Sequence, residues 1–232
     1  MIISPQRNFI FIHLYKCGGT SIERAYAKIS LWDDLILGST EFGEYAQNYY
    51  NRKFGLHKHS FVKDIVKALG EERYLSMETF ALVRNPFRIY ESLYGWIKGM
   101  YLGAAGNLSL EELKAKVRAG KAEIPFRPAA LAYAHSEDFF GFMDYFKKKG
   151  LPFEPLSNSL MLDNSQFRVK HVYKLEDLGM FRQHFHQLAG VPLEQMHVNK
   201  SSGTRINWHP TQRAWIRDVH RHDLQRFGYE LD

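Results

Sequence analysis

The chain has 232 residues, of which 45% are hydrophobic and 24% are charged. These are the proportions of a folded globular protein, and they exclude a disordered or collagen-like chain. Its 31 lysines and arginines outnumber 25 acidic residues and give a net charge of +6. This charge favours anionic partners, without choosing among nucleotides, nucleic acid, and sulfated or phosphorylated ligands.

The sequence also limits where the protein is expected to work. The single cysteine, Cys17, excludes an internal disulfide. No apolar run reaches the about 18 residues that a transmembrane helix needs. The first residues lack the basic start and long apolar stretch of a secretory signal. We therefore expect a cytoplasmic protein without a membrane span.

The first half of the chain contains two predicted strand–helix units. Residues 8–15 form an apolar, β-prone run typical of a strand buried on both faces. A Gly-rich turn follows, and residues 22–29 then have one apolar helical face. Residues 79–83 form a second short strand, and Pro86 is well placed to open a helix that runs towards Trp96.

A third unit lies in the second half of the chain. Residues 171–175 are a strand candidate, and a helix over about 176–188 ends near Gly190. The last predicted helix starts near Thr211. Strands that alternate with helices predict an α/β fold with a central parallel sheet covered by helices on both faces.

The residues between the second and third units are mostly helical in pattern. Ser109 and Glu112 form a capping box, and another helix is predicted between Ser136 and Gly150. We interpret the stretch of about 101–165 as a helical insertion. The prediction is therefore a single domain over 1–232.

The turn after the first strand has the composition of an anion-binding site. Gly18 and Gly19 permit close backbone approach where N–H groups and the positive end of a helix converge. Thr20 and Ser21 add hydroxyl donors, and Lys16 adds a full charge. A Gly-Gly helix start is otherwise a simple tight turn with an ordinary hydroxyl cap, so both interpretations stay open.

The order of residues in this turn differs from a Walker A sequence, in which the lysine follows the glycines. Here Lys16 precedes them, and residues 11–21, Phe-Ile-His-Leu-Tyr-Lys-Cys-Gly-Gly-Thr-Ser, resemble the 5′-phosphosulfate loop of sulfotransferases. These enzymes use 3′-phosphoadenosine 5′-phosphosulfate (PAPS). Arg84, at the end of the second strand, and Ser92, eight residues later, resemble the 3′-phosphate element of the same family.

Two further stretches resemble the branch of this family that contains carbohydrate sulfotransferases and many bacterial relatives. They are residues 172–178 and residues 197–202, and a C-terminal helix follows the second. The four stretches occur in the family's order over nearly the whole chain, whereas the insertion matches no pattern. Arg88 lies one residue earlier than the second arginine usual in this branch, so its role stays open.

The resemblance implies a P-loop-like three-layer fold. It also implies transfer of a sulfuryl group from PAPS to a hydroxyl of a carbohydrate or other small acceptor. The product of the donor is 3′,5′-ADP, and no metal is required. Lys16 is the candidate cation for the leaving phosphate oxygen. The loop residues expected to bind the 5′ phosphate are Lys16, Cys17, Gly18, Gly19, Thr20 and Ser21.

The remaining donor contacts come from three other parts of the chain. Arg84 and Ser92 are expected to hold the 3′ phosphate, although an arginine at a strand end is otherwise a structural ion-pair partner. In the related enzymes the segment that matches 199–205 folds over the nucleotide. Its polar side chains are therefore cofactor-binding candidates, namely Lys200, Ser201, Ser202 and Arg205. Cys17 is a loop thiol near a positive helix end or, alternatively, a small filler.

The general base is sought among the histidines. The His57-Lys58-His59 segment resembles the His-x-His of heparan-type uronosyl sulfotransferases, in which a histidine of this segment is the base. In a strand the two histidines would face one side. We predict His59 as the base and His57 as its support, with ordinary loop histidines as the alternative. His13 is the second candidate, or else a packed histidine that is hydrogen-bonded to backbone.

Two other classes of function remain as alternatives. A nucleotide-dependent kinase of P-loop fold would need a Gly-Lys-Ser/Thr loop and no Arg84–Ser92 pair. A basic nucleic-acid-binding protein would show a recognition helix, zinc spacing or an RNA-binding aromatic motif. Among the remaining histidines, the pairs His184/His186 and His220/His222 are spaced i, i+2 in predicted helices and face different sides, so we expect no metal site. The identity of the acceptor and the oligomeric state stay open.

Overall fold

The structure is a computed structural model that describes residues 1–151, 153–163, 166–190, 192 and 206–230. The described residues belong to two compact units. The first contains Met1–Arg84 and Glu154–Lys200, and the second contains Asn85–Phe153 and Ser201–Asp232. The expected insertion of 101–165 is therefore divided, with its residues up to 153 in the second unit.

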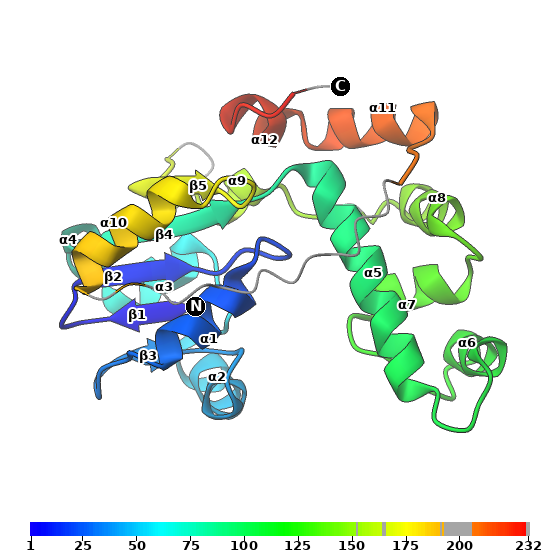
Figure 1. Ribbon diagram of the computed structural model, residues 1–232, viewed down its shortest axis with the longest axis horizontal. Helices are drawn as coiled ribbons and strands as arrows, with labels where there is room; N and C mark the ends of the chain where they lie inside the picture. The colour runs from blue at the N-terminus through cyan, green and yellow to red at the C-terminus, as the bar shows by residue number, and fades with distance from the viewer. Residues whose placement is uncertain (152, 164–165, 191, 193–205, 231–232) are drawn as a thin grey trace. The chain divides into compact units, whose positions relative to one another are not determined.

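A mixed β-sheet forms the centre of the first unit (Figure 1). Its strand order is β3-β1-β2-β4-β5. Strands β2, β4 and β5 are parallel neighbours, whereas β1 is antiparallel to both β2 and β3. The bounds of the strands are β1 Ile2–Ser4, β2 Phe9–Ile12, β3 Leu35–Ile36, β4 Glu78–Val83 and β5 His171–Lys174. The α/β class is confirmed, and the three predicted strands are parallel neighbours, but the sheet as a whole is mixed and not the parallel sheet that we expected.

The mixed sheet has a simple physical reason. A short turn joins β1 to β2, and in it the N–H of Asn8 donates to the carbonyl of Pro5 at 3.3 Å. A connection this short can join only antiparallel neighbours, whereas parallel neighbours need a long crossover. The helix-containing segments between β2 and β4 and between β4 and β5 supply such crossovers.

The three predicted strands lie where the sequence places them, with one shortened end. The strands expected at 79–83 and 171–175 are observed within one residue of their bounds. The strand expected at 8–15 ends at Ile12, because the chain leaves the ladder and enters the turn that carries Lys16. The helix after that turn starts at Gly19, three residues earlier than predicted.

Two helices cover one face of the sheet through aromatic packing. These are α1 (Gly19–Ala27) and α10 (Gly179–Ala189). The ring of Phe9 lies 5.3 Å from Tyr26 of α1 and 5.4 Å from Phe185 of α10, both in edge-to-face geometry. In Figure 1, α3 (Val62–Leu69) lies behind the sheet. The other helices of this unit are α2 (Glu41–Phe54), α4 (Glu71–Ser76) and α9 (Leu156–Ser159).

The second unit is helical in the part that the structure describes. Its helices are α5 (Pro86–Ala104), α6 (Leu110–Arg118), α7 (Arg127–Ala134), α8 (Phe139–Lys149), α11 (Pro210–Val219) and α12 (Arg221–Arg226). Its core is a cluster of buried aromatic and aliphatic side chains that includes Tyr90, Tyr101 and Phe142. The predicted capping box at the start of α6 and Pro86 at the start of α5 are confirmed. Helix α8 begins after Asp138 rather than at Ser136, because the Asp138 carboxylate caps it.

None of the described helices is long and apolar enough to cross a membrane.

Candidate functional site

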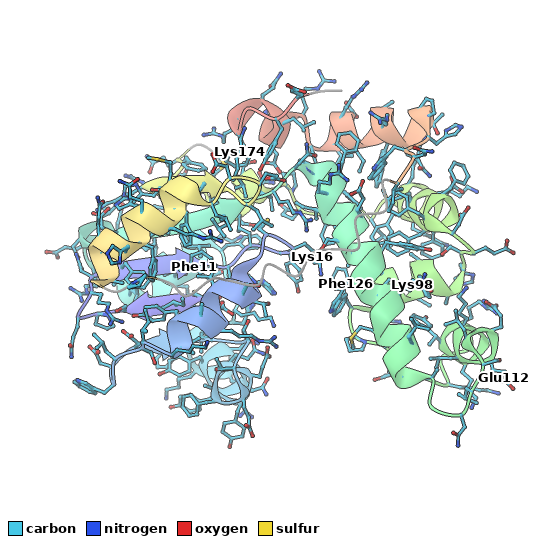
Figure 2. All side chains as sticks on the ribbon, in the orientation of Figure 1. Phe11, Lys16, Lys98, Glu112, Phe126 and Lys174 are labelled. Carbon is cyan, nitrogen blue, oxygen red and sulfur yellow. The ribbon has the colours of Figure 1, made fainter. Side chains whose placement is uncertain are left out.

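The carboxyl ends of β2, β4 and β5 meet at one edge of the sheet, because these strands are parallel neighbours. A basic residue lies at or just beyond each end: Lys16, Arg84 and Lys174. Figure 2 labels Lys16 and Lys174. In open α/β sheets ligands bind at the carboxyl ends of strands, so this edge is the candidate site. Sequence analysis did not select Lys174, although its place at the end of the third predicted strand was the available signal.

The turn after β2 brings the main chain into an unusual conformation. Lys16 has a φ angle of +58°, in the left-handed region that residues with a Cβ rarely adopt. Its carbonyl accepts a hydrogen bond of 3.2 Å from Nη1 of Arg84. The end of β4 therefore holds the turn after β2 in this conformation. Such locally strained backbone persists where the surrounding structure fixes it, and it is frequent at functional sites.

The two glycines of the turn are required by packing within the protein. Gly18 has a φ angle of +81°, and a Cβ there would lie 2.6 Å from Cδ1 of Leu175. A Cβ on Gly19 would overlap the ring of His13. The sequence predicts that another group approaches the backbone closely at these glycines. In the structure that group is a side chain of the protein itself, Leu175 at Gly18 and His13 at Gly19.

The start of α1 keeps its backbone donors directed at the turn. The N-cap is Gly18, which has no side chain to cap the helix. The N–H of Ser21 donates to the carbonyl of Gly18 at 3.0 Å, and the N–H groups that precede it in a helix have no acceptor within the helix. Within α1, which is described throughout, the first turn carries no acidic side chain. Thr20 and Ser21 lie in this first turn and are partly buried. The set of donors suits an anion.

Cys17 differs from its neighbours in the turn. Its thiol is buried, and Sγ donates to the carbonyl of Tyr15 at 3.2 Å. This contact turns the side chain into the protein, as expected for a small filler of the loop.

Electrostatic repulsion accompanies this arrangement. Burial, with a further contribution from the charge of Arg84, lowers the pKa of the Lys16 ammonium group to about 8. Lys16 is therefore still mainly protonated at neutral pH. An anion bound at this edge would relieve the repulsion and raise the pKa of Lys16 again.

The His57-Lys58-His59 segment forms a turn and not a strand. The N–H of His57 donates to Oγ of Ser60 at 2.8 Å, and the N–H of His59 donates to Nδ1 of His57 at 3.1 Å. The ring of His57 thus braces the turn that presents His59. Burial lowers the pKa of His57.

The ring of His59 lies on the residues that lead into the turn after β2. It stacks on Tyr15, with centroids 3.8 Å apart, and meets the His13 ring edge-on at 4.6 Å. Its Nδ1 lies 2.9 Å from the carbonyl oxygen of His13. Burial, together with the neighbouring His13, lowers the pKa of His59 to about 2, so the ring is neutral. The favoured base candidate therefore contacts the segment that carries Lys16.

His13 is almost completely buried at the end of β2. Its ring is bonded to a carboxylate and not to backbone, because Nδ1 lies 2.6 Å from Oε1 of Glu23 in α1. Burial lowers the pKa of His13. Burial opposes ionisation of Glu23, but hydrogen bonds from His13 and from the amino group of Met1 outweigh it and lower the pKa of Glu23 to about 2. Sequence analysis missed Glu23.

The other predicted site residues lie in the second unit or outside the described residues. Ser92 lies in α5 of the second unit. Arg88 is exposed and pairs with Glu91 at 2.6 Å, as a surface ion pair does. The predicted nucleotide-covering residues lie outside the described residues; they are Lys200, Ser201, Ser202 and Arg205. Among the described residues, no group of three or more His, Cys, Asp or Glu side chains has a metal-binding arrangement.

Comparisons of this chain with protein-family models, curated proteins and solved structures found no match.

Proposed function

We propose that the protein is a PAPS-dependent sulfotransferase whose donor site is the edge formed by the ends of β2, β4 and β5. One observation carries the proposal. A strand, a Lys-x-Gly-Gly turn and a helix start follow one another, and Arg84 of the next parallel strand donates to the carbonyl of Lys16. Two cations and a set of helix N–H groups suit a ligand that carries several negative charges.

We also propose a P-loop-like fold for the first unit. Strands β2, β4 and β5, with their crossover helices, would form a P-loop-like core. Strand β1, which is antiparallel to β2, and strand β3 beyond it extend this core on one side. The turn after β2 would then take the place of a phosphate loop, with its lysine before the glycines instead of after them.

The chemistry asks two things of this chain's own residues. PAPS supplies the sulfuryl group and a good leaving group. Lys16 would stabilise the charge that develops on the bridging oxygen of the 5′ phosphate. His59 would take the proton of the acceptor hydroxyl. One S–O bond forms to the acceptor as the S–O bond to the phosphate breaks, and 3′,5′-ADP leaves.

The low pKa of His59 fits this role only when an anion is bound. A base must hold a proton in the transition state, and a pKa of about 2 makes the ring a poor acceptor. A polyanionic donor bound beside His59 would raise its pKa, because nearby negative charge favours the imidazolium form. The base would therefore become effective when the donor is in place.

Ligand-dependent stability tests the proposal first. We expect 3′,5′-ADP at about 100 times its Kd to stabilise the protein by about 2.7 kcal/mol, because a ligand that binds only the folded state shifts unfolding by mass action. Thermal unfolding would be measured with 3′,5′-ADP, Mg-ATP and an oligonucleotide. Stabilisation by Mg-ATP alone would favour a kinase, and stabilisation by the oligonucleotide alone would favour a nucleic-acid binder.

Activity is tested second, with labelled sulfate. PAPS carrying ³⁵S would be incubated with a panel of carbohydrate and small hydroxyl acceptors, and transfer would be followed by separation of the products. The same assay is run on Lys16→Met, a variant that removes the charge of the side chain and keeps its length. Transfer that is unaffected in Lys16→Met would contradict the assignment of this edge.

A further inference from the structure

Glu23 is a charged residue at a core position. The buried side of α1 consists of Gly19, Ile22, Glu23 and Tyr26. The sequence predicts an apolar face here, and Glu23 is completely buried in it. A buried carboxylate is costly unless it is charged against a partner and hydrogen-bonded. A leucine would be less costly to bury at this position, so we infer that the carboxylate has a specific role.

The partners of Glu23 inside the fold are the amino group of Met1 and the ring of His13. Oε1 of Glu23 lies 2.6 Å from Nδ1 of His13. A carboxylate only accepts hydrogen bonds, so Nδ1 of His13 carries the proton. The same ring is pressed against Gly19, where no Cβ would fit. Glu23 thereby fixes the residue at the end of β2 against the start of α1.

The backbone of His13 in turn fixes His59. The carbonyl oxygen of His13 lies 2.9 Å from Nδ1 of His59, and a carbonyl only accepts. Nδ1 of His59 must therefore be the protonated nitrogen. In a neutral imidazole the other nitrogen, Nε2, then keeps its lone pair. The contact thus selects one tautomer of His59 and one basic atom.

We propose that Glu23 is a positioning residue that acts through His13, and that it holds His59 as the Nδ1–H tautomer with Nε2 as the basic atom. This role rests on the proposed function, in which His59 takes the proton of the acceptor. Tyr15 and His13, which hold the ring of His59, belong to the segment that leads directly to Lys16. The base therefore packs on the same short stretch of chain that carries the cation for the leaving group.

Other ionisable groups face this cluster and belong in any test. The amino group of Met1 contacts Glu23, and the charge of Lys58 acts on both His13 and His59. Lys58 is itself paired with Glu44 at 2.9 Å. A pH titration must therefore follow the ring nitrogens of His59 directly, and not infer them from the global behaviour of the protein.

The tautomer can be measured without any donor or acceptor. Long-range ¹H–¹⁵N correlation spectra distinguish protonated from unprotonated ring nitrogens, and the signals of His59 are assigned by their loss in His59→Asn. We expect a protonated Nδ1 and an unprotonated Nε2 from pH 6 to pH 8. An Nε2–H tautomer, or a doubly protonated ring, would overturn the proposal even if the protein proves to be a sulfotransferase.

The role of Glu23 is tested by Glu23→Gln, which keeps the shape and removes the charge. The matched control is Asp34→Asn. Asp34 is another buried carboxylate of this unit, and it accepts hydrogen bonds from Tyr26 and from the N–H of Leu31 at 2.6 and 2.7 Å. Both variants should lower the melting temperature. Only Glu23→Gln should move the ring nitrogen signals of His59 towards the average of the two tautomers.

Kinetics separate positioning from a purely structural effect. In Glu23→Gln we expect kcat to fall by about 10–100-fold, with the donor KM within about 2-fold, because a misplaced base slows chemistry without weakening binding. If Glu23→Gln does not fold, His13→Asn keeps the backbone carbonyl, removes the ring and gives the same readouts. Unmoved His59 signals in the variant would refute the role of Glu23. A correct tautomer without sulfuryl transfer would refute the proposed function alone.

Discussion

In the sheet of the first unit, charged side chains are arranged differently at the amino ends and at the carboxyl ends of the parallel strands. At the amino ends of β4 and β5, Glu78 accepts from Lys170 at 2.9 Å and from His171 at 2.7 Å. These two hydrogen bonds lower the pKa of Glu78. At the carboxyl ends, Arg84 instead donates to a backbone carbonyl, and its charge helps to lower the pKa of Lys16. Opposite charges meet at one edge, and like charges meet at the other.

The difference is the one we expect if the amino-end edge serves stability and the carboxyl-end edge binds the proposed ligand. A partly exposed ion pair adds little to the stability of the folded state. Two cations held close together raise the energy of the empty site, and a bound anion recovers that energy. The strained backbone of Lys16 and the start of α1 at Gly19 also lie at this second edge. The predictions below test whether function follows that division.

The largest expected effect is on transfer in Lys16→Met. We expect kcat to fall by about 10²–10³-fold, the usual loss when a group that stabilises developing negative charge is removed. The steady-state rate would be measured with labelled PAPS. Lys170→Met at the opposite edge is the matched control and should leave the rate unchanged. Equal losses in the two variants would show that the edges are not used differently.

The next effect concerns the affinity for the nucleotide. Arg84→Ala should weaken binding of 3′,5′-ADP by about 2–4 kcal/mol, the loss expected when one partner of a charged hydrogen-bonded contact is removed. AMP, which lacks the 3′ phosphate, should lose much less. Isothermal titration calorimetry measures both ligands. Equal losses would mean that Arg84 acts only by holding the carbonyl of Lys16, and not by binding the 3′ phosphate.

A smaller effect is expected from pH. The pKa of Lys16 is about 8 in the free protein, and a bound anion raises it. Binding therefore takes up a proton above pH 8, and affinity for 3′,5′-ADP should fall as pH rises, by at most about tenfold per pH unit. Below pH 7 Lys16 is already protonated, so affinity should be flat. Calorimetry from pH 6.5 to 9.5 checks this, and Lys16→Met should lose the slope.

The strand ends and the turn that form the candidate site were predictable because their signals are local in sequence. An apolar run followed by Lys16-Cys17-Gly18-Gly19 shows a strand end, a turn and a helix start within a few residues. The strands before Arg84 and around Lys174 were equally local, and parallel order brings their ends together. The short strands β1 and β3 were missed because three and two residues carry no readable periodicity.

The contacts within the site were not predictable, because they join distant residues. His59 lies 46 positions from the His13 carbonyl that it contacts, and only the tertiary fold brings them together. In the sequence Glu23 has the pattern of an ordinary helix residue. Only the structure shows that it is buried against His13. The sequence also left open whether His57-Lys58-His59 is a strand or a helix, and the structure shows a turn that is closed by Ser60.

The smallest effect is expected at the amino-end edge, in Glu78→Gln. The hydrogen bonds from Lys170 and His171 lower the pKa of Glu78, so they stabilise the folded state above the unfolded pKa and lose this contribution as pH falls through the folded pKa. The pair is partly exposed and screened, so the loss at pH 7 should stay below about 1 kcal/mol. Urea unfolding of the wild type and the variant at pH 7 and pH 3 would show the difference shrinking in acid. Transfer and binding of 3′,5′-ADP should not change. If Glu78→Gln instead lowered transfer as much as Lys16→Met does, charge pairing at this edge would belong to the function, and the contrast between the two edges would not hold.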